Sequence, residues 1–155
     1  GWNHYDFCWF TRSNSRIYRG SEEQQLGQEY FDEEIYDHKQ ERVDTLPLFL
    51  KNIAIHNLEE FIKPIVMDSE SASKIVENNI NMIFIDGSHT FNSARNDYKC
   101  WKNKIREGGI LAIHDIYDSE SEGGQAPKEI YLKSLSEGFK LVERVRSLVI
   151  LEKSN

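Results

Sequence analysis

Two short apolar segments constrain the fold of this chain more than any other feature. They are MIFIDGSH (82–89) and GGILAIHD (108–115), and each ends with an acidic residue near a histidine. Neither run is long enough for an independent helix, and neither alternates between apolar and polar residues, so each predicts a strand buried on both faces. Such strands are typical of parallel sheets, whose ligands bind outside the carboxyl ends of the strands. The side chains expected together at that edge are Asp86, His89, His114 and Asp115.

The segment between these two runs has the pattern of an amphipathic helix. Apolar and aromatic residues recur at three- and four-residue steps from Phe91 to Ile105, and polar residues fill the positions between them. A strand, a helix and a second strand in this order predict a right-handed crossover between parallel strands. Residues 106–109 are predicted to connect the helix to the second strand.

The end of the chain predicts an antiparallel hairpin. After a polar loop, a helix is expected to start at Ala126 or Pro127 and to stop at Gly138, with proline near its first position and glycine after its last. Two strand segments follow, 139–145 and 147–152, and the connection between them is too short for a parallel crossover. This pair is therefore predicted to close one edge of the sheet.

A third short apolar run, residues 62–67, lies upstream of the first two. It contains Pro64, and proline is tolerated mainly on edge strands or near the start of a strand. We therefore expect an edge strand that ends at Asp68, followed by a short helix capped by Ser69 or Ser71.

A core helix is predicted before this run, over residues 46–54. Asp44 or Thr45 can cap it, Pro47 lies in its first turn, and its apolar residues form one stripe. His56 follows the helix and is expected to be a surface or capping residue rather than a ligand.

An aromatic segment and an acidic segment precede this helix. Residues 4–10 are rich in aromatics and predict a strand that carries Asp6. Residues 21–43 are acidic, with aromatic residues at roughly helical spacing. This pattern fits either a solvated helix that covers the sheet edge or a substrate-side lid within residues 16–43.

Size and charge exclude several classes of partner. With 155 residues, the chain is expected to form a single domain over 1–155 with a sizeable core. The net charge is −7 and the Lys and Arg residues are scattered, which argues against a nucleic-acid partner. No apolar stretch is long enough to cross a bilayer, and the first residues lack the layout of a signal peptide. We therefore expect a cytoplasmic protein without a membrane partner, and leave open whether it forms a homo-oligomer.

The cysteines give no sign of a metal site or a disulfide framework. Cys8 and Cys100 are far apart in the sequence and each lies beside aromatic residues. Both are expected to be reduced, buried thiols, which fits a reducing compartment.

Taken together, the motifs resemble those of class I S-adenosylmethionine-dependent methyltransferases. The segments that carry the resemblance are MIFIDGSHTF (82–91), the helix end DYKCW (97–101) and GGILAIHD (108–115). Their order is similar to that in the branch of macrocin O-methyltransferase-like and cephalosporin-hydroxylase-like enzymes. The region from Phe49 to Ser69 also looks like the third-strand region of that branch. The resemblance implies an α/β fold with a Rossmann-like, mostly parallel sheet, a C-terminal antiparallel hairpin and helices on both faces.

The resemblance also implies an activity: methyl transfer from S-adenosylmethionine to a hydroxyl group of a small molecule, such as a sugar or natural product. In metal-assisted members, Mg²⁺ binds at the positions of Asp86, His114 and Asp115. A divalent ion there would polarise the acceptor hydroxyl. Because Mg²⁺ prefers oxygen ligands, His114 could instead act as an acid or base, or hydrogen-bond Asp115.

Further site residues follow from the same resemblance. His89 matches the general base of related O-methyltransferases, a task that suits a histidine near neutral pKa. For the acidic residues, the simpler alternative is helix capping at a strand-to-helix turn. The residues expected to contact the cofactor are Asp68 and Ser69 at the adenine, Asp6 at the ribose, and Asp86 and Ser88 after the strand.

One part of the family pattern has no match in this chain. Family members carry a glycine-rich turn after their first strand, whereas Gly20 and Gly27 lie in acidic sequence without a preceding apolar run. The chain also begins at Gly1 rather than methionine. We therefore expect the missing strand and turn to lie outside these 155 residues, although a fold rebuilt without them is the alternative.

Two other functions remain open at this point. The first is a catalytically inactive methyltransferase-like domain that acts in binding or as a scaffold. The second is a metal-dependent hydrolase, in which Asp86 and the His114–Asp115 pair would hold an ion that activates water. A hydrolase would need further histidine ligands, which His4, His38 and His56 do not supply at helical spacing.

Overall fold

The computed structural model of the chain describes residues 33, 36–39, 41–43, 46–87 and 90–154. Within these residues a four-stranded sheet has the order β3-β4-β6-β5. β3 (Ile80–Ile85) and β4 (Ile105–Ile113) are parallel, with Ile83 opposite Leu111. β5 (Phe139–Val145) and β6 (Leu148–Lys153) form the antiparallel hairpin, and β6 also pairs with β4 in the antiparallel direction. The α/β fold class, the parallel crossover and the terminal hairpin are thereby confirmed, in a mixed sheet.

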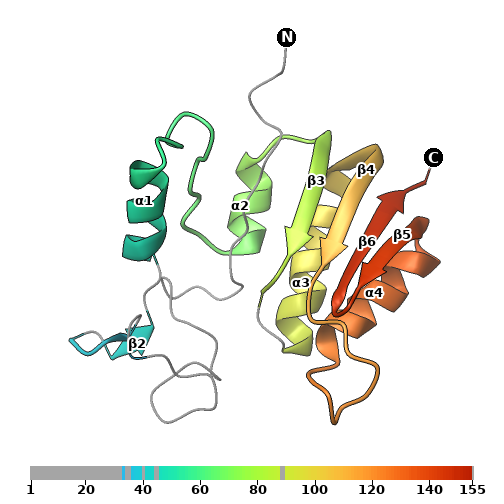
Figure 1. Cartoon of the computed structure of the whole chain (residues 1–155). Helices are drawn as coiled ribbons and strands as arrows, with labels where there is room; N and C mark the ends of the chain where they lie inside the picture. Colours follow the sequence, from blue (N-terminus) through green and yellow to red (C-terminus); the bar gives the residue numbers. More distant parts are fainter. Residues whose placement is uncertain (1–32, 34–35, 40, 44–45, 88–89, 155) are drawn as a thin grey trace.

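The helices that follow β3 and β4 cover one face of the sheet (Figure 1). α3 (Phe91–Trp101) continues into a short 3₁₀ turn at Lys102–Lys104, and α4 (Ala126–Ser136) begins with proline in its first turn. The covered face and the helices share one core, because alternate residues of the strands point the same way. Its fully buried side chains include Ile83, Leu111, Ile113, Val149, Leu151, Tyr98, Trp101 and Ile130.

The start of β4 differs from its prediction. Residues 106–109 were expected to be a connection, but they form the first part of the strand, which begins at Ile105. Gly109 lies where a Cβ would come 2.7 Å from the side chain of Ile105 and 2.9 Å from the carbonyl oxygen of Arg106. Gly109 therefore allows a close backbone approach, and Gly108 adopts a left-handed backbone with φ of 68°, at the irregularity where the pairing of β3 with β4 shifts between Ile80–Ile105 and Met82–Ile110.

The predicted edge strand over 62–67 is wrong. The chain makes a turn after Leu58, where Phe61 and Ile62 donate backbone hydrogen bonds to its carbonyl oxygen, and residues 62–67 form no regular strand. Pro64 lacks a backbone donor, and Val66 and Met67 are exposed rather than packed on a sheet. Among the described strands of this sheet, β3 lies at one edge and β5 at the other.

The helices on either side of this segment are present, with changes. α1 (Leu46–Ile55) was expected to be a core helix, but Ile53 is its one buried residue and Leu50 is exposed. α2 (Ser69–Ile75) is capped by Asp68 rather than by Ser69 or Ser71. An apolar stripe thus correctly predicted the helix α1 but not its burial, because burial depends on which other segments pack against it.

The acidic region before α1 is described only in part. β1 (Tyr36–Asp37) and β2 (Arg42–Val43) form a short antiparallel pair, so these residues do not continue the predicted helix. The rest of the predicted lid and the strand over residues 4–10 lie outside the described residues. None of the helices in the described ranges is both long and apolar enough to span a membrane.

Candidate functional site

Three of the predicted site residues meet at the carboxyl ends of β3 and β4. Nδ1 of His114 lies 3.2 Å from Oδ1 of Asp86 and 3.2 Å from Oδ1 of Asp115. One ligand atom from each residue lies within 4.8 Å of the other two. They are in reach of solvent: 48% of the Asp86 side chain is exposed, 40% of His114 and 19% of Asp115. The edge therefore presents two carboxylates and one imidazole nitrogen to a ligand from outside.

The parallel pairing of the two strands explains why these residues meet. The register places Ile85 opposite Ile113, so the residues that follow each strand leave the sheet side by side. The backbone N–H of His114 still donates a hydrogen bond to the carbonyl oxygen of Ile85, at 3.1 Å. The ring of Phe84 also lies against His114, with 6.3 Å between the ring centroids. The position of His114 is thus fixed by β3 through its backbone and its ring.

Asp115 adopts a left-handed backbone conformation, with φ of 59°. This region is uncommon for residues other than glycine, although aspartate tolerates it better than most. Its Oδ1 accepts a hydrogen bond from the hydroxyl of Tyr117 at 3.1 Å. A residue held in this conformation shortly after a strand turns the chain sharply, so that the two consecutive side chains that follow β4, His114 and Asp115, can face the same ligand.

A buried carboxyl group lies behind the exposed cluster. A small cavity with room for a water-sized group is lined by Asp86, Gly87, His114 and, from α3, Asp97. Asp97 is 3% exposed, and no described residue donates a hydrogen bond to its Oδ1. Burial raises the pKa of Asp97 to about 6, and a hydrogen bond with Ser69 acts in the opposite direction. The cavity is therefore lined by a residue whose buried carboxyl group has an unsatisfied acceptor.

Gly87 lies against this carboxyl group. A Cβ at Gly87 would lie 2.9 Å from Oδ2 of Asp97, so a side chain at this position would push on the carboxylate. The turn after β3 is thus packed onto α3 at a position where only glycine fits. Asp97 belongs to the segment DYKCW that carries part of the resemblance, and the structure places it beside Asp86 and His114 in the lining of the cavity.

Asp68 and Ser69 are not part of the cluster. Asp68 caps α2, because its Oδ1 accepts from the backbone N–H of Ser71 and its Oδ2 from the Ser71 hydroxyl, both at 2.9 Å. These hydrogen bonds lower the pKa of Asp68. Ser69 is fully buried and hydrogen-bonds Asp97, which closes its hydroxyl to a ligand from solvent. The capping interpretation of Asp68 is therefore observed, and its contact with an adenine stays a prediction.

The remaining predicted site residues lie outside the described residues. These are Asp6, Ser88 and His89. Their assigned roles stay predictions from the resemblance.

Sequence reasoning missed three residues that contact the cluster or the segment after it. Tyr117 donates to Asp115, Ser147 lies with its Oγ 3.5 Å from Nε2 of His114, and Arg144 donates to the carbonyl oxygen of Ile116. Two of them come from the β5–β6 hairpin, far from the motifs in sequence. The predicted hairpin could have pointed to them, because a strand antiparallel to β4 begins at the edge where β4 ends.

The strand order, the crossover and the polar edge define an α/β protein of the Rossmann-like class. A family model described as a methyltransferase domain matches residues 9–116, which is more than half of the chain. The chain belongs to this methyltransferase-domain family.

Solved structures with a similar fold include two methyltransferases at low sequence identity. A protein described as an rRNA-methylase from Clostridium thermocellum is 16% identical, with a TM-score of 0.52 over 68% of this chain and 65% of that one. The O-methyltransferase NovP is 14% identical, with a TM-score of 0.50 over 89% of this chain and 57% of that one. The chain thus spans less than two thirds of the length of either structure. At this identity the likeness shows the shared fold.

Proposed function

We propose that this chain takes part in S-adenosylmethionine-dependent methyl transfer to a hydroxyl group of a small molecule, assisted by a divalent cation. Membership of the methyltransferase-domain family supports the reaction class. The observation that carries the proposal is the meeting of Asp86, His114 and Asp115 at the edge of the sheet where α/β proteins bind ligands.

The donor atoms of this cluster fit a divalent cation. Two carboxylates supply negative charge and oxygen ligands, and Nδ1 of His114 faces both of them. Carboxylates suit Mg²⁺ and Mn²⁺, whereas imidazole favours the later transition metals, so the mixed set should bind Mn²⁺ more tightly than Mg²⁺. When bound, the cation would polarise the acceptor hydroxyl and lower its pKa.

The chain's own residues have distinct tasks in this proposal. S-Adenosylmethionine supplies a methyl group that is already activated, so the protein must align the acceptor oxygen and take up its proton. By resemblance, His89 takes up that proton. Asp86 and Asp115 hold the cation beside the acceptor, and the 19% exposure of Asp115 limits competing water at that ligand.

The cofactor contacts in this proposal rest on the resemblance. They place Asp68 at the adenine, with Asp86 and Ser88 along the cofactor and Asp6 at the ribose. The cavity between the strands and α3 has room only for a water-sized group, so the cofactor would lie over the sheet edge rather than inside it.

Calorimetric titration and a charge-neutral variant test this proposal. The chain should bind S-adenosylmethionine with micromolar affinity, and Asp86→Asn should abolish methyl transfer while its circular dichroism and melting temperature stay those of the parent. Glu107→Gln is the matched control, because Glu107 is an exposed acid at the opposite end of the β4 strand. Full activity in Asp86→Asn would remove this residue from the mechanism.

The rival functions predict different titrations. Cleavage of a phosphoester with bound Mn²⁺ or Zn²⁺, without affinity for S-adenosylmethionine, would indicate a hydrolase. Binding of neither the cofactor nor a metal would indicate a non-catalytic domain. His89→Ala separates two roles within the preferred function, because loss of a general base lowers turnover more than cofactor affinity.

A further inference from the structure

The β5–β6 hairpin holds the segment that carries two of the three cluster residues. In Figure 1 the turn of this hairpin and the loop after β4 lie at the same end of the sheet, where β3 and β4 end. The backbone N–H of Ile116 donates to the carbonyl oxygen of Ser147 at 2.8 Å. The Ile116 side chain is buried in the core. The residue directly after Asp115 is therefore fixed by the hairpin as well as by the core.

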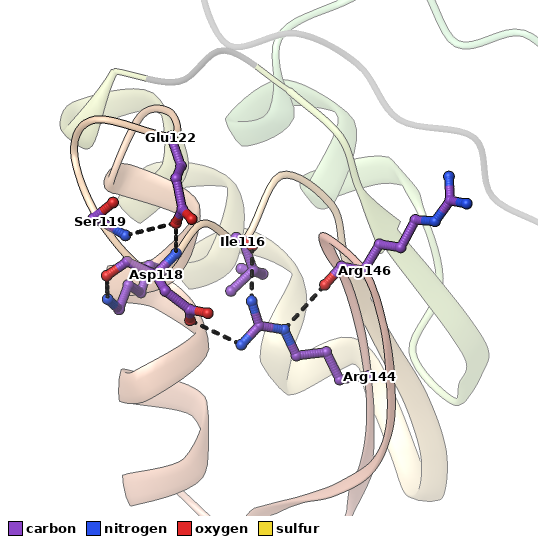
Figure 2. Close-up of polar contacts among 7 residues, drawn as sticks. Ile116, Asp118, Ser119, Glu122, Arg144 and Arg146 are labelled. Atoms are coloured by element: carbon purple, nitrogen blue, oxygen red, sulfur yellow. Dashed lines mark hydrogen bonds and ion pairs between the residues drawn. The ribbon is translucent and has the colours of Figure 1, made fainter.

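Arg144 of β5 adds a second, charged connection to the same segment. Figure 2 shows its guanidinium between three acceptors. Nη2 donates to the carbonyl oxygen of Ile116 at 3.2 Å, Nη1 to Oδ1 of Asp118 at 2.9 Å, and Nε to the carbonyl oxygen of Arg146 at 3.0 Å. The ion pair lowers the pKa of Asp118. A planar guanidinium can satisfy three acceptors in fixed directions, which an ammonium group cannot reproduce.

The residues on both sides of Asp115 are held in place by backbone hydrogen bonds. On one side, the N–H of His114 is bonded to β3, and on the other, both backbone groups of Ile116 are bonded to the hairpin. A left-handed backbone at Asp115 costs free energy and persists only where the surrounding structure enforces it. The hairpin contacts supply that enforcement, and thereby set the direction in which the Asp115 carboxylate points.

The hairpin also reaches the imidazole. Oγ of Ser147 lies 3.5 Å from Nε2 of His114, on the side of the ring opposite to the two carboxylates. In metal sites a ligating imidazole commonly donates its second N–H to a neighbouring acceptor, which fixes the tautomer and the ring orientation. Ser147 is placed to accept this proton while Nδ1 faces the carboxylates.

We infer that Arg144 and Ser147 are positioning residues of the cation site: Arg144 sets the backbone of Asp115, and Ser147 sets the tautomer of His114. This inference rests on the proposed function, because it concerns the affinity of the same cluster for a divalent ion. Neither Arg144 nor Ser147 would contact the ion directly. Each would act through a residue that does, Asp115 or His114.

The test measures Mn²⁺ affinity of the 155-residue chain by electron paramagnetic resonance and calorimetry, well below the melting temperature. Arg144→Gln should weaken Mn²⁺ binding by about 10- to 100-fold, and Ser147→Ala by about 10-fold, as loss of an outer-shell partner commonly does. Arg144→Lys keeps the positive charge but loses the planar guanidinium with its donors in fixed directions. The Mn²⁺ affinity of this variant should therefore lie between those of the parent and Arg144→Gln. The bound-Mn²⁺ spectrum should broaden in the variants, a change that a merely structural role would not produce.

Arg95→Gln is the matched control. Arg95 makes a two-pronged ion pair with Glu129 on α4, at 2.7 and 2.8 Å, and its guanidinium lies over the ring of Phe91, so its described contacts are not with the cluster. Its loss should leave Mn²⁺ affinity within twofold of the parent. Parent-like affinity in folded Arg144→Gln and Ser147→Ala would overturn the inference alone. A parent chain that binds no Mn²⁺ would refute the cation site, and the inference with it.

Discussion

Two regions of the molecule, residues 46–79 and 80–154, both contain apolar runs but bury them to different extents. In 80–154 the strands and helices share a buried core in which Trp101 and Leu111 are almost fully enclosed. In 46–79 the large apolar side chains are mostly at the surface, among them Leu50, Ile55, Phe61 and Val66. The described contacts of this first region with the rest run mainly through α2, which packs on α3.

The difference shows what an apolar pattern can and cannot determine. A strand such as β4 has neighbours on both sides and a covered face, so its side chains are removed from water on folding. The run 62–67 is also largely apolar, but among the described residues no strand pairs with it. Local sequence therefore encodes the tendency to form an element, whereas the partners in space decide how much free energy its burial contributes.

The largest expected contrast is between leucines of the two regions. Leu111→Ala, in the centre of β4 and 0% exposed, should lower the free energy of unfolding by about 3 kcal/mol, because it removes buried methyl groups and leaves a cavity. Leu50→Ala, on α1 and 45% exposed, should cost less than about 1 kcal/mol. Urea denaturation followed by circular dichroism measures both. Equal costs would mean that α1 is as tightly packed as the sheet.

The second region was also the more predictable from sequence. The local sequence pattern favours the observed secondary structure in each of its main elements, which are β3, α3, α4 and the hairpin. Local preference and the overall fold therefore agree in this region. For 62–67 the apolar run favoured a strand, but Pro64 had already removed one ladder donor and no pairing strand could be read from the sequence. A segment becomes a strand only when another strand pairs with it, and the local sequence of 62–67 does not specify such a partner.

Asp97 provides the second prediction, at the boundary between the two regions. Its pKa is raised to about 6 from 3.8, so the folded state holds the proton more tightly than the unfolded state does. Its contribution to stability is therefore fully present below about pH 4 and is lost as the pH rises through about 6. Relative to Asp97→Asn, the parent should lose roughly 2 kcal/mol of unfolding free energy between pH 4 and pH 7.

Denaturation of both proteins across this pH range measures the effect. The difference between the two curves isolates Asp97, because the other titrating groups are common to both. Asp118→Asn is a suitable control, since Asp118 is exposed and its pKa is lowered by Arg144 rather than raised by burial. A parent and an Asp97→Asn variant with parallel pH profiles would show that the carboxyl group is better solvated than its burial implies.

The site was predictable only where it depends on the sheet. Two buried runs of the same direction bring Asp86 to His114 and Asp115, and that follows from strand polarity alone. The support behind the cluster depends on side-chain geometry across the fold: Arg144 and Ser147 act from a hairpin about thirty residues later in the chain. No local spacing encodes such contacts, and the orphaned oxygen of Asp97 is visible only once α3 is packed.

The smallest expected effect comes from the cap of α2, and it tests whether residues 46–79 unfold together with the sheet. Asp68 caps α2, so Asp68→Ala should cost about 1 kcal/mol, whereas Asp68→Asn, which keeps a side-chain acceptor, should cost less. Hydrogen exchange decides how this loss is distributed. Because Ser69 at the start of α2 hydrogen-bonds Asp97 of α3, we expect α2 and α3 amides to lose protection together. Faster exchange confined to α2 would instead mean that residues 46–79 open independently of the sheet, and that the contrast in burial is also a contrast in cooperativity.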